Sequence, residues 1–271
     1  MSRGLADSSA YQLLHSVRRF SRWLDRPATP ADLDSGTVSA WLAHLERHLA
    51  RRTVAGHRIN LLSLWRELAS DGLCDPPRRV RIVRRPEPLP VAWTQDELAR
   101  IVAQCERLSG RMPNGVDRRI YALALVLSAY DTGLRRSDLW TLERRAIRPD
   151  GSIVLLQRKT SRPHQPRLRQ RALELIASLP GDRPMACPYR CRSAFYRWWR
   201  RDIIKPAGVR HGALQQLRRT GATHLAIEHR SEVQRYLGHA SPEMQRFYID
   251  ESIACPIVHL PPEIAAGERA G

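Results

Sequence analysis

Hydrophobic residues recur at three- and four-residue spacing through the first third of the chain. This period is typical of helices that bury one face, and it predicts three of them, over residues 9–24, 35–49 and 53–72. Thr53 is a candidate cap for the third helix, and Gly72 is its candidate end. The expected inward positions are Leu13, Val17, Phe20 and Leu24, then Val38, Trp41, Leu42, Leu45 and Leu49, then Ile59, Leu62, Trp65 and Leu68. Three such helices would make a small all-helical bundle.

The helical period stops in residues 75–93, where prolines and arginines crowd together. The prolines stand at positions 76, 77, 86, 88 and 90, and the arginines at 78, 79, 81, 84 and 85. Proline favours extended backbone, so we expect a helical domain over residues 1–82 and a basic linker over residues 83–93. The residues alone do not decide whether this charge follows a DNA backbone or faces solvent.

Residues 94–255 predict a second, larger domain with mixed secondary structure. Thr94 begins the pattern Thr-Gln-Asp-Glu, which is the capping box of a helix start. Residues 118–130 are strongly apolar and predict a buried central helix, whereas residues 153–157 predict a strand. The further elements expected are a loop over 158–166, a short strand leading into a helix over 168–178, a helix over 192–204, helices from 214 and 231, and a flexible tail over 256–271. The fold class predicted is therefore mainly α with a small β-sheet.

The end of this domain contains two short helix patterns separated by a sharp break. Gly238 suits the left-handed backbone of a helix end, and His239 follows it. Ser241, Pro242 and Glu243 form a second helix start, which would put Tyr248 two turns into that helix. The break allows His239 and Tyr248 to face one cleft. Taken alone, the stretch is an ordinary helix-turn-helix with an ordinary histidine and tyrosine.

The charge balance of the chain indicates an anionic partner. The formal net charge is +18 among 271 residues, and nucleic acid is the first candidate partner for such a chain. A merely soluble basic protein is the alternative. Nearly all basic residues are arginines, and the lysines are Lys159 and Lys205.

Cysteine usage and hydropathy bear on metal binding and location. Five cysteines, an odd number, argue against a secreted disulfide framework. Cys187 and Cys191 lack a second ligand pair at zinc-finger spacing, so we expect no metal site. The N-terminus lacks an apolar signal region, and the longest apolar run, residues 120–130, is too short to span a bilayer. We therefore expect a cytoplasmic protein, which would associate with the nucleoid if its anionic partner is DNA.

Three motifs in order give the chain a family resemblance. They are TGLRRSDL at residues 132–139, LRRTGATHL at 217–225, and LGH at 237–239 with a tyrosine nine residues after the histidine. In this order and spacing they resemble the catalytic motifs of the tyrosine recombinases, or phage integrases. The resemblance runs from about Leu89 to Tyr248. The front third resembles, more loosely, the helical core-binding (SAM-like) domain of that family, and the rest its mixed α+β catalytic domain.

The resemblance implies an enzyme that breaks and rejoins DNA without a metal ion, ATP or another cofactor. Tyr248 would attack a phosphodiester, form a 3′-phosphotyrosyl bond and release a 5′-hydroxyl. Arg135 and Arg218 match the family arginines that hold the phosphate, Lys159 matches the general acid, and His239 matches a phosphate-binding histidine. The implied partners are double-stranded DNA, a homotetramer on two duplexes, and accessory DNA-bending proteins, with no membrane.

Two positions depart from the family pattern. Gln215 stands three residues before Arg218, where the family usually has histidine. A glutamine amide can donate a hydrogen bond to phosphate but cannot exchange a proton at neutral pH. Asp138 stands where glutamate is common, and it would orient an arginine. His211 lies one further turn back and would replace the missing histidine only if the backbone brought it close.

Three functions therefore remain open on the sequence. The first is site-specific recombination or integration by a tyrosine recombinase. The second is DNA binding by a protein that keeps the recombinase fold but has weak or lost cleavage, which Gln215 favours. The third is a type IB topoisomerase-like enzyme, which shares the chemistry and would relax a plasmid without a paired site.

Overall fold

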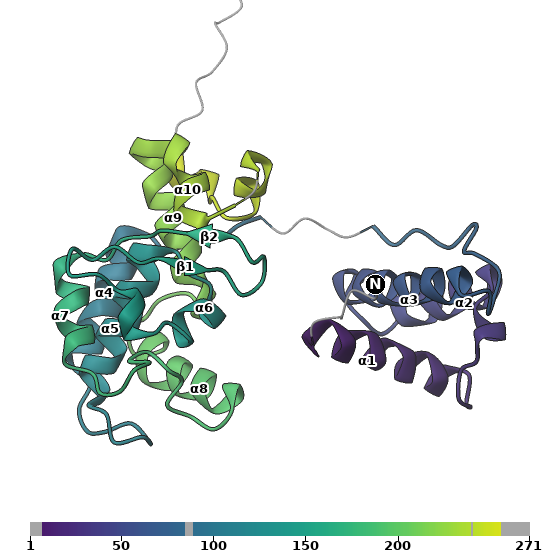
Figure 1. Ribbon diagram of the computed structural model, residues 1–271, viewed down its shortest axis with the longest axis horizontal. Helices are drawn as coiled ribbons and strands as arrows, with labels where there is room; N and C mark the ends of the chain where they lie inside the picture. Colours follow the sequence, from purple (N-terminus) through teal and green to yellow (C-terminus); the bar gives the residue numbers. More distant parts are fainter. Residues whose placement is uncertain (1–6, 85–88, 240, 256–271) are drawn as a thin grey trace, which may run out of the picture. The chain divides into compact units, whose positions relative to one another are not determined.

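The computed structural model describes residues 7–84, 89–239 and 241–255, and it divides the chain into two compact units. The units are Met1–Pro88 and Leu89–Gly271, and each has its own hydrophobic core (Figure 1). The tail expected over residues 256–271 lies outside the described residues.

In its described residues the first unit is a bundle of three α-helices, as its hydrophobic period predicts. Its aromatic core is formed by Phe20, Trp41 and Trp65, which are at most 2% exposed. Asp34 caps the second helix, because its carboxylate accepts the backbone N–H groups of Gly36 and Thr37. The elements are α1 (Asp7–Trp23), η1 (Pro30–Asp32), α2 (Ser35–Glu46) and α3 (Arg51–Ser70).

Two expectations for the third helix are wrong. Thr53 lies inside α3, which begins at Arg51, and the cap position is held by Ala50. Ile59 is 55% exposed rather than inward. Because each helical residue turns by about 100°, Ile59 lies about 120° around the helix from buried Trp65. A spacing of three residues does not show whether a residue lies on the buried face of a helix or at its edge.

The second unit is mostly helical and has a two-stranded antiparallel sheet, which confirms the predicted fold class. Thr94 forms the expected capping box with Glu97 at the start of its first helix. The elements up to the sheet are α4 (Gln95–Glu106), α5 (Arg118–Thr132), α6 (Arg136–Trp140), η2 (Arg144–Ala146), β1 (Leu155–Leu156) and β2 (Pro163–His164). Those after it are α7 (Gln170–Ala177), α8 (Arg192–Trp198), η3 (Trp199–Ile204), α9 (Gln215–His229), η4 (Arg230–Glu232), α10 (Val233–Leu237), η5 (Pro242–Phe247) and α11 (Glu251–Ala254).

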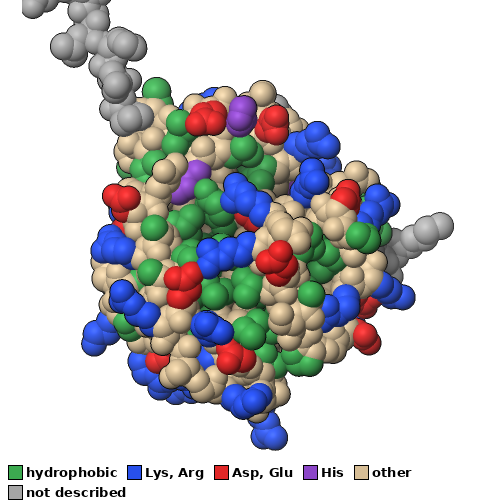
Figure 2. Space-filling model, turned by 90° about the vertical axis from the view of Figure 1, so that its left-hand side faces the viewer, with side chains coloured by type: hydrophobic (Ala, Val, Ile, Leu, Met, Phe, Trp, Pro, Cys, Tyr) green, Lys and Arg blue, Asp and Glu red, His purple; other side chains and the backbone are tan. Residues whose placement is uncertain are grey.

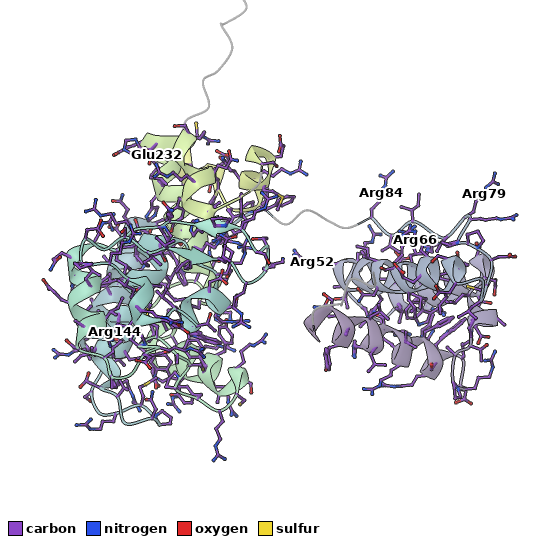
Figure 3. All side chains as sticks on the ribbon, in the orientation of Figure 1. Arg52, Arg66, Arg79, Arg84, Arg144 and Glu232 are labelled. Carbon is purple, nitrogen blue, oxygen red and sulfur yellow. The ribbon has the colours of Figure 1, made fainter. Side chains whose placement is uncertain are left out.

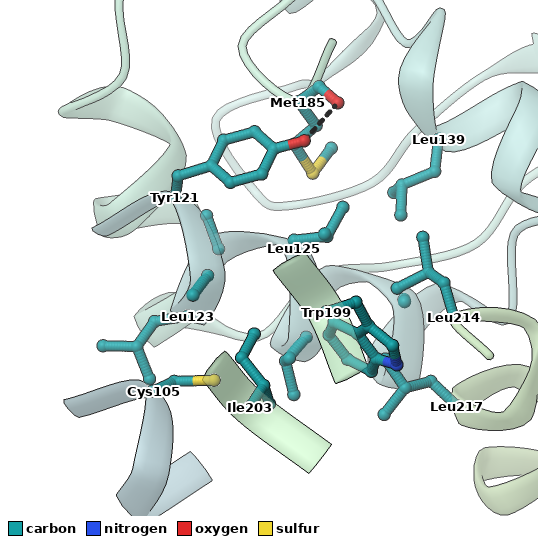
Figure 4. Packing of buried hydrophobic residues seen from close by; sticks show 14 of the residues in the cluster. Cys105, Tyr121, Leu123, Leu125, Leu139, Met185, Trp199, Ile203, Leu214 and Leu217 are labelled. Atoms are coloured by element: carbon teal, nitrogen blue, oxygen red, sulfur yellow. Dashed lines mark hydrogen bonds between the residues drawn. The ribbon is translucent and has the colours of Figure 1, made fainter. Parts of the chain in front are cut away.

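Helix α5 is the central element of this unit, and α4, α6, α7 and α9 all contact it. Figure 4 shows the core around it, where Leu125 lies near Trp199 of η3. The indole of Trp199 donates a hydrogen bond to the Gly212 carbonyl at 2.8 Å. The hydroxyl of Tyr121 donates to backbone carbonyls of the loop before α8, among them that of Met185 (Figure 4). These two buried polar groups of the core are thus paired, and the core gives α9 a fixed support.

The sheet differs from its expected extent. Only Leu155 and Leu156 of the expected strand pair as β1, and they face His164 and Pro163. β2 therefore lies inside residues 158–166, which were expected to form a loop throughout. Proline has no N–H to donate, and the short hairpin ends beside it.

Three further elements differ in detail from expectation. The short strand expected at the start of residues 168–178 is not formed, and Arg167, just before it, makes only an isolated bridge to Ser152. The helix over 192–204 changes from α-helical to π-helical at Trp199. Tyr248 follows the 3₁₀-helix η5 instead of lying two turns into an α-helix. No helix within the described residues is long and apolar enough to cross a membrane.

Candidate active site

Arg218 lies at the centre of the candidate site and is 1% exposed. It projects from α9, and its guanidinium donates hydrogen bonds to the backbone carbonyls of Gly133 and Leu237, the latter at 2.7 Å. A third hydrogen bond runs to His239 Nε2 at 3.0 Å. Burial lowers the pKa of Arg218 to about 10, so it remains a cation at neutral pH. Its Nε atom is buried and has no hydrogen-bond partner within the described residues.

The contact with Arg218 sets the proton position on His239. A guanidinium only donates, so His239 Nε2 must accept and the neutral ring carries its proton on Nδ1. Burial, followed by the charges of Arg218 and Arg135, lowers the pKa of His239 to about 4. The Nδ1 atom is buried and has no partner within the described residues. At neutral pH His239 is therefore an uncharged hydrogen-bond donor.

Tyr248 lies against this pair, as the break at Gly238 predicts. Its ring centre is 4.7 Å from that of His239, with the rings edge to face, and 5.0 Å from the guanidinium carbon of Arg218. The tyrosine is half-buried. The structure thus brings His239 and Tyr248 together, as the break at Gly238 was expected to allow.

Hydrogen bonds to backbone groups hold the segment that contains Tyr248 against α9. The Thr223 hydroxyl donates to the Tyr248 carbonyl at 3.4 Å and accepts from the Asp250 N–H at 2.9 Å. The Asp250 carboxylate in turn accepts the Ala92 N–H at 3.0 Å. The residues after Tyr248 are thus tied both to α9 and to the start of the unit.

Hydrogen bonds of Gln157, a residue that no sequence motif identifies, link Arg135 to the site. Arg135 is half-buried at the start of α6, and its Nη1 donates to Gln157 Oε1 at 2.6 Å. The amide nitrogen of Gln157 donates to the Leu237 carbonyl at 3.3 Å, which is the same oxygen that Arg218 binds. Gln157 follows β1, where its buried position shows only in three dimensions.

His164 is a second residue that sequence reasoning missed. It lies on β2 and is 4% exposed, and its Nε2 has no partner within the described residues. Burial, followed by the charge of Arg218, lowers the pKa of His164 to about 4. No motif marks this residue, because residues 158–166 were expected to be a loop.

Gly238 permits these side chains to approach the turn before His239. Its φ is +57°, as expected for the left-handed end of α10. A Cβ atom at this position would lie 2.5 Å from His164 Nδ1 and against Gln157 Nε2. Glycine is therefore required here both for backbone conformation and for space.

Among the described residues, the other expected site residues make no side-chain hydrogen bond to this cluster. Lys159 is exposed on the turn between β1 and β2, and within the described residues its side chain has no hydrogen bond or ion pair. Gln215 is half-buried at the first position of α9, one turn before Arg218. His211 is exposed in the preceding loop.

Asp138 is placed differently from expectation. Within the described residues no arginine side chain binds Asp138. Its carboxylate instead accepts the backbone N–H of Arg158 at 3.0 Å, which ties α6 to the turn that carries Lys159. Arg136, the neighbour of Arg135, donates to the Tyr196 hydroxyl at 2.9 Å and lies over the Trp140 ring.

Comparison with known proteins decides the family. The family model described as the phage integrase family matches residues 92–254, more than half of the chain. The chain belongs to the phage integrase family. The resemblance of its motifs to those of the tyrosine recombinases is thereby confirmed.

Two curated relatives of this tyrosine recombinase family are similar over most of their length. The tyrosine recombinase XerD of Rhizobium meliloti (strain 1021) is 23% identical over 254 residues, which are 87% of this chain and 81% of the relative. The tyrosine recombinase XerD of Caulobacter vibrioides (strain ATCC 19089 / CIP 103742 / CB 15) is 24% identical over 241 residues, which are 80% and 77% of the two chains.

Solved structures of integrases share the fold. A lambda integrase dimer bound to a COC′ core site has a TM-score of 0.70 and 20% identity, covering 92% of this chain and 91% of that one. The XerH site-specific recombinase bound to its difH substrate has a TM-score of 0.67 and 18% identity, covering 88% and 76%. At these identities the likeness concerns the fold.

The first unit of this integrase-family chain carries a basic groove of about 550 Å³. The groove lies between α3 and the extended segment after it, from which Arg79 and Arg84 project (Figure 3). Its lining consists of Arg58, Arg66, Arg78, Arg79 and Arg81 with Leu62, Pro77, Val80 and Ile82. On the face shown in Figure 2, by contrast, basic side chains are interspersed with acidic ones. The groove is therefore a candidate contact for a nucleic-acid backbone.

Proposed function

We propose that this protein is a tyrosine site-specific recombinase that cleaves and rejoins DNA through a covalent 3′-phosphotyrosyl intermediate. One observation carries the proposal: a buried guanidinium, a neutral histidine and a half-buried tyrosine meet at a single point, on Arg218, His239 and Tyr248. A phosphodiester bound there would meet a fixed cation, a hydrogen-bond donor and a nucleophile.

The phosphate-binding step follows from the donors of the cluster. Arg135 and Arg218 supply two guanidinium charges, and His239 supplies the N–H of its Nδ1. These groups would donate to the non-bridging oxygens, whose negative charge increases as phosphorus becomes pentacoordinate. Because protein contacts fix them before DNA binds, they need little rearrangement during the reaction.

The covalent step exchanges one phosphate ester for another. The Tyr248 oxygen forms a bond to phosphorus while the bond to the 5′-oxygen breaks, and the phenol proton passes to solvent. Lys159 donates a proton to the departing 5′-oxygen. The turn that carries Lys159 is held by hydrogen bonds from its two neighbours, from the Arg158 N–H to Asp138 and from the Thr160 hydroxyl to Gln157. A 5′-hydroxyl of a second strand reverses the step, so the chemistry needs neither a metal ion nor ATP.

Gln215 favours one other candidate function, namely DNA binding with weak or lost cleavage. Its amide would donate a hydrogen bond to the phosphate from the first turn of α9, but it cannot exchange a proton. A type IB topoisomerase-like relaxing activity uses the same chemistry, and relaxation of a plasmid that lacks a paired site would identify it.

The partner of the proposed reaction is double-stranded DNA. A lambda integrase tetramer bound to a Holliday junction has a TM-score of 0.71 and 22% identity to this chain. We propose that this protein likewise acts as a homotetramer on two duplexes, with accessory DNA-bending proteins as further partners. The protein would then be located in the cytoplasm and would associate with the nucleoid when it is bound to DNA.

The test of this function is covalent capture of DNA without added metal. A duplex from the DNA that flanks the gene, nicked near the cleavage point, traps the intermediate, and a denaturing gel detects protein joined to DNA. The wild-type protein should form an adduct and Tyr248→Phe should not. Tyr236→Phe is the matched control, because the Tyr236 hydroxyl is bound to the Tyr130 carbonyl at 2.6 Å. An adduct in Tyr248→Phe would refute the assignment of the nucleophile.

A further inference from the structure

Gln157 connects the two arginines of the proposed phosphate site, although no motif assigns it a role. Its side chain is buried, since the residue is 1% exposed. Its Oε1 accepts from Arg135 at 2.6 Å and from the Thr160 hydroxyl at 2.9 Å. Its Nε2 donates to the Leu237 carbonyl at 3.3 Å. Both ends of one amide are therefore engaged within the site.

The Leu237 carbonyl is the point at which the two arginines are joined. Arg218 Nη2 donates to this oxygen at 2.7 Å and also binds His239. A continuous path of hydrogen bonds thus runs from Arg135 through Gln157 and the Leu237 carbonyl to Arg218. We propose that Gln157 is a positioning residue, which holds Arg135 and the turn from Leu237 to His239 in the geometry that receives the scissile phosphate.

The chemistry of glutamine suits this role better than that of its near neighbours. A neutral amide oxygen orients the Arg135 guanidinium without cancelling the charge that the phosphate needs. A carboxylate would pair with Arg135 and would face the Leu237 carbonyl without a proton to donate. An apolar side chain would leave both the arginine N–H and the buried carbonyl without this partner. Gln157 also contacts Gly238, so its position fixes the backbone just before His239.

The inference rests on the proposed cleavage reaction, and its test uses the full chain and the same nicked duplex. Gln157→Met keeps the length of the side chain and removes its three hydrogen bonds, to Arg135, Thr160 and the Leu237 carbonyl. It should slow adduct formation at saturating protein by about tenfold or more, which is about 1.4 kcal/mol of activation free energy, while DNA affinity stays within a few-fold. Gln157→Glu should slow it further. Gln170→Met is the matched control, because Gln170 is exposed on α7 and pairs with Glu174.

A double-mutant cycle separates positioning from general support of the fold. If Gln157 acts through Arg135, then Gln157→Met should have little further effect on the cleavage rate in an Arg135→Ala background. Additive effects of the two substitutions would overturn the inference, as would a wild-type rate in Gln157→Met. Failure of the wild-type protein itself to form an adduct would overturn the proposed function, and this inference with it.

Discussion

Replacement of Gly238 by alanine tests whether the turn before His239 is as tightly packed as its contacts imply. The added methyl would lie 2.5 Å from His164 Nδ1. That atom would have to retreat by about 0.9 Å to reach the 3.4 Å of ordinary contact, and Gln157 on the other side would also have to move. Either movement disturbs buried groups that contact the candidate site.

Two terms set the expected loss of stability in Gly238→Ala. The left-handed backbone, with φ of +57°, costs an alanine about 1 kcal/mol. Displacement of the Gln157 amide breaks its hydrogen bond to the Leu237 carbonyl and leaves the buried amide nitrogen unpaired, which costs about 1–3 kcal/mol more. We expect the free energy of unfolding to fall by about 2–4 kcal/mol and adduct formation to slow by more than the folded fraction explains.

Gly181→Ala is the matched control for this substitution. Gly181 has a φ of +78°, and no described heavy atom lies within 4 Å of the place that an added methyl would occupy, so the variant bears the backbone cost without the clash. Urea denaturation of both variants, with adduct assays on nicked DNA, measures the difference. Equal stability and equal cleavage in the two alanine variants would refute the argument that packing at Gly238 shapes the site.

Three further predictions concern single groups of the site. The free energy of unfolding of His164→Leu should fall less on acidification than that of the wild type. The pKa of His164 is lowered to about 4 in the folded protein, so below about pH 6.5 the unfolded state binds a proton that the folded state does not. This histidine should therefore cost the wild type about 2 kcal/mol of unfolding free energy at pH 4.5. Urea denaturation at pH 7 and 4.5 measures this, and an equal decline in both proteins would contradict it. Gln215→His should preserve or increase cleavage on nicked DNA, whereas a clear loss with folding and DNA binding intact would show that the glutamine has a specific local role. Arg218→Lys should lose about 2 kcal/mol of unfolding free energy and cleave about a hundredfold more slowly, because one ammonium cannot reproduce the three fixed hydrogen bonds of the guanidinium. A cleavage rate near that of the wild type would disprove this.

The sequence predicts the parts of the fold that depend on local chemistry. The capping box at Thr94, the left-handed helix end at Gly238 and the apolar helix α5 all follow from residue types at short spacing. Ile59 is misplaced because its spacing does not distinguish the buried stripe from its edge. The second strand is missed because Pro163 masks its start.

The candidate site divides in the same way between local and long-range information. Arg218, His239 and Tyr248 lie within the ordered motifs, and the resemblance of these motifs to those of the tyrosine recombinases implies that they share one site, where the structure brings them together. Gln157 and His164 reach the site only through the pairing of β1 with β2 and its packing against the end of α10. Neither residue type is distinctive in a loop, so burial beside the arginines is the signal that identifies them.

The measurement that tests the central claim most directly is identification of the amino acid joined to DNA. The wild-type protein is trapped on a nicked duplex, the adduct is digested with protease and nuclease, and mass spectrometry locates the residual nucleotide on a peptide. The account predicts a 3′-phosphotyrosyl linkage on the peptide that contains Tyr248, formed without metal or ATP. A linkage at another residue, or no adduct on DNA that the protein binds at its own site, would contradict it.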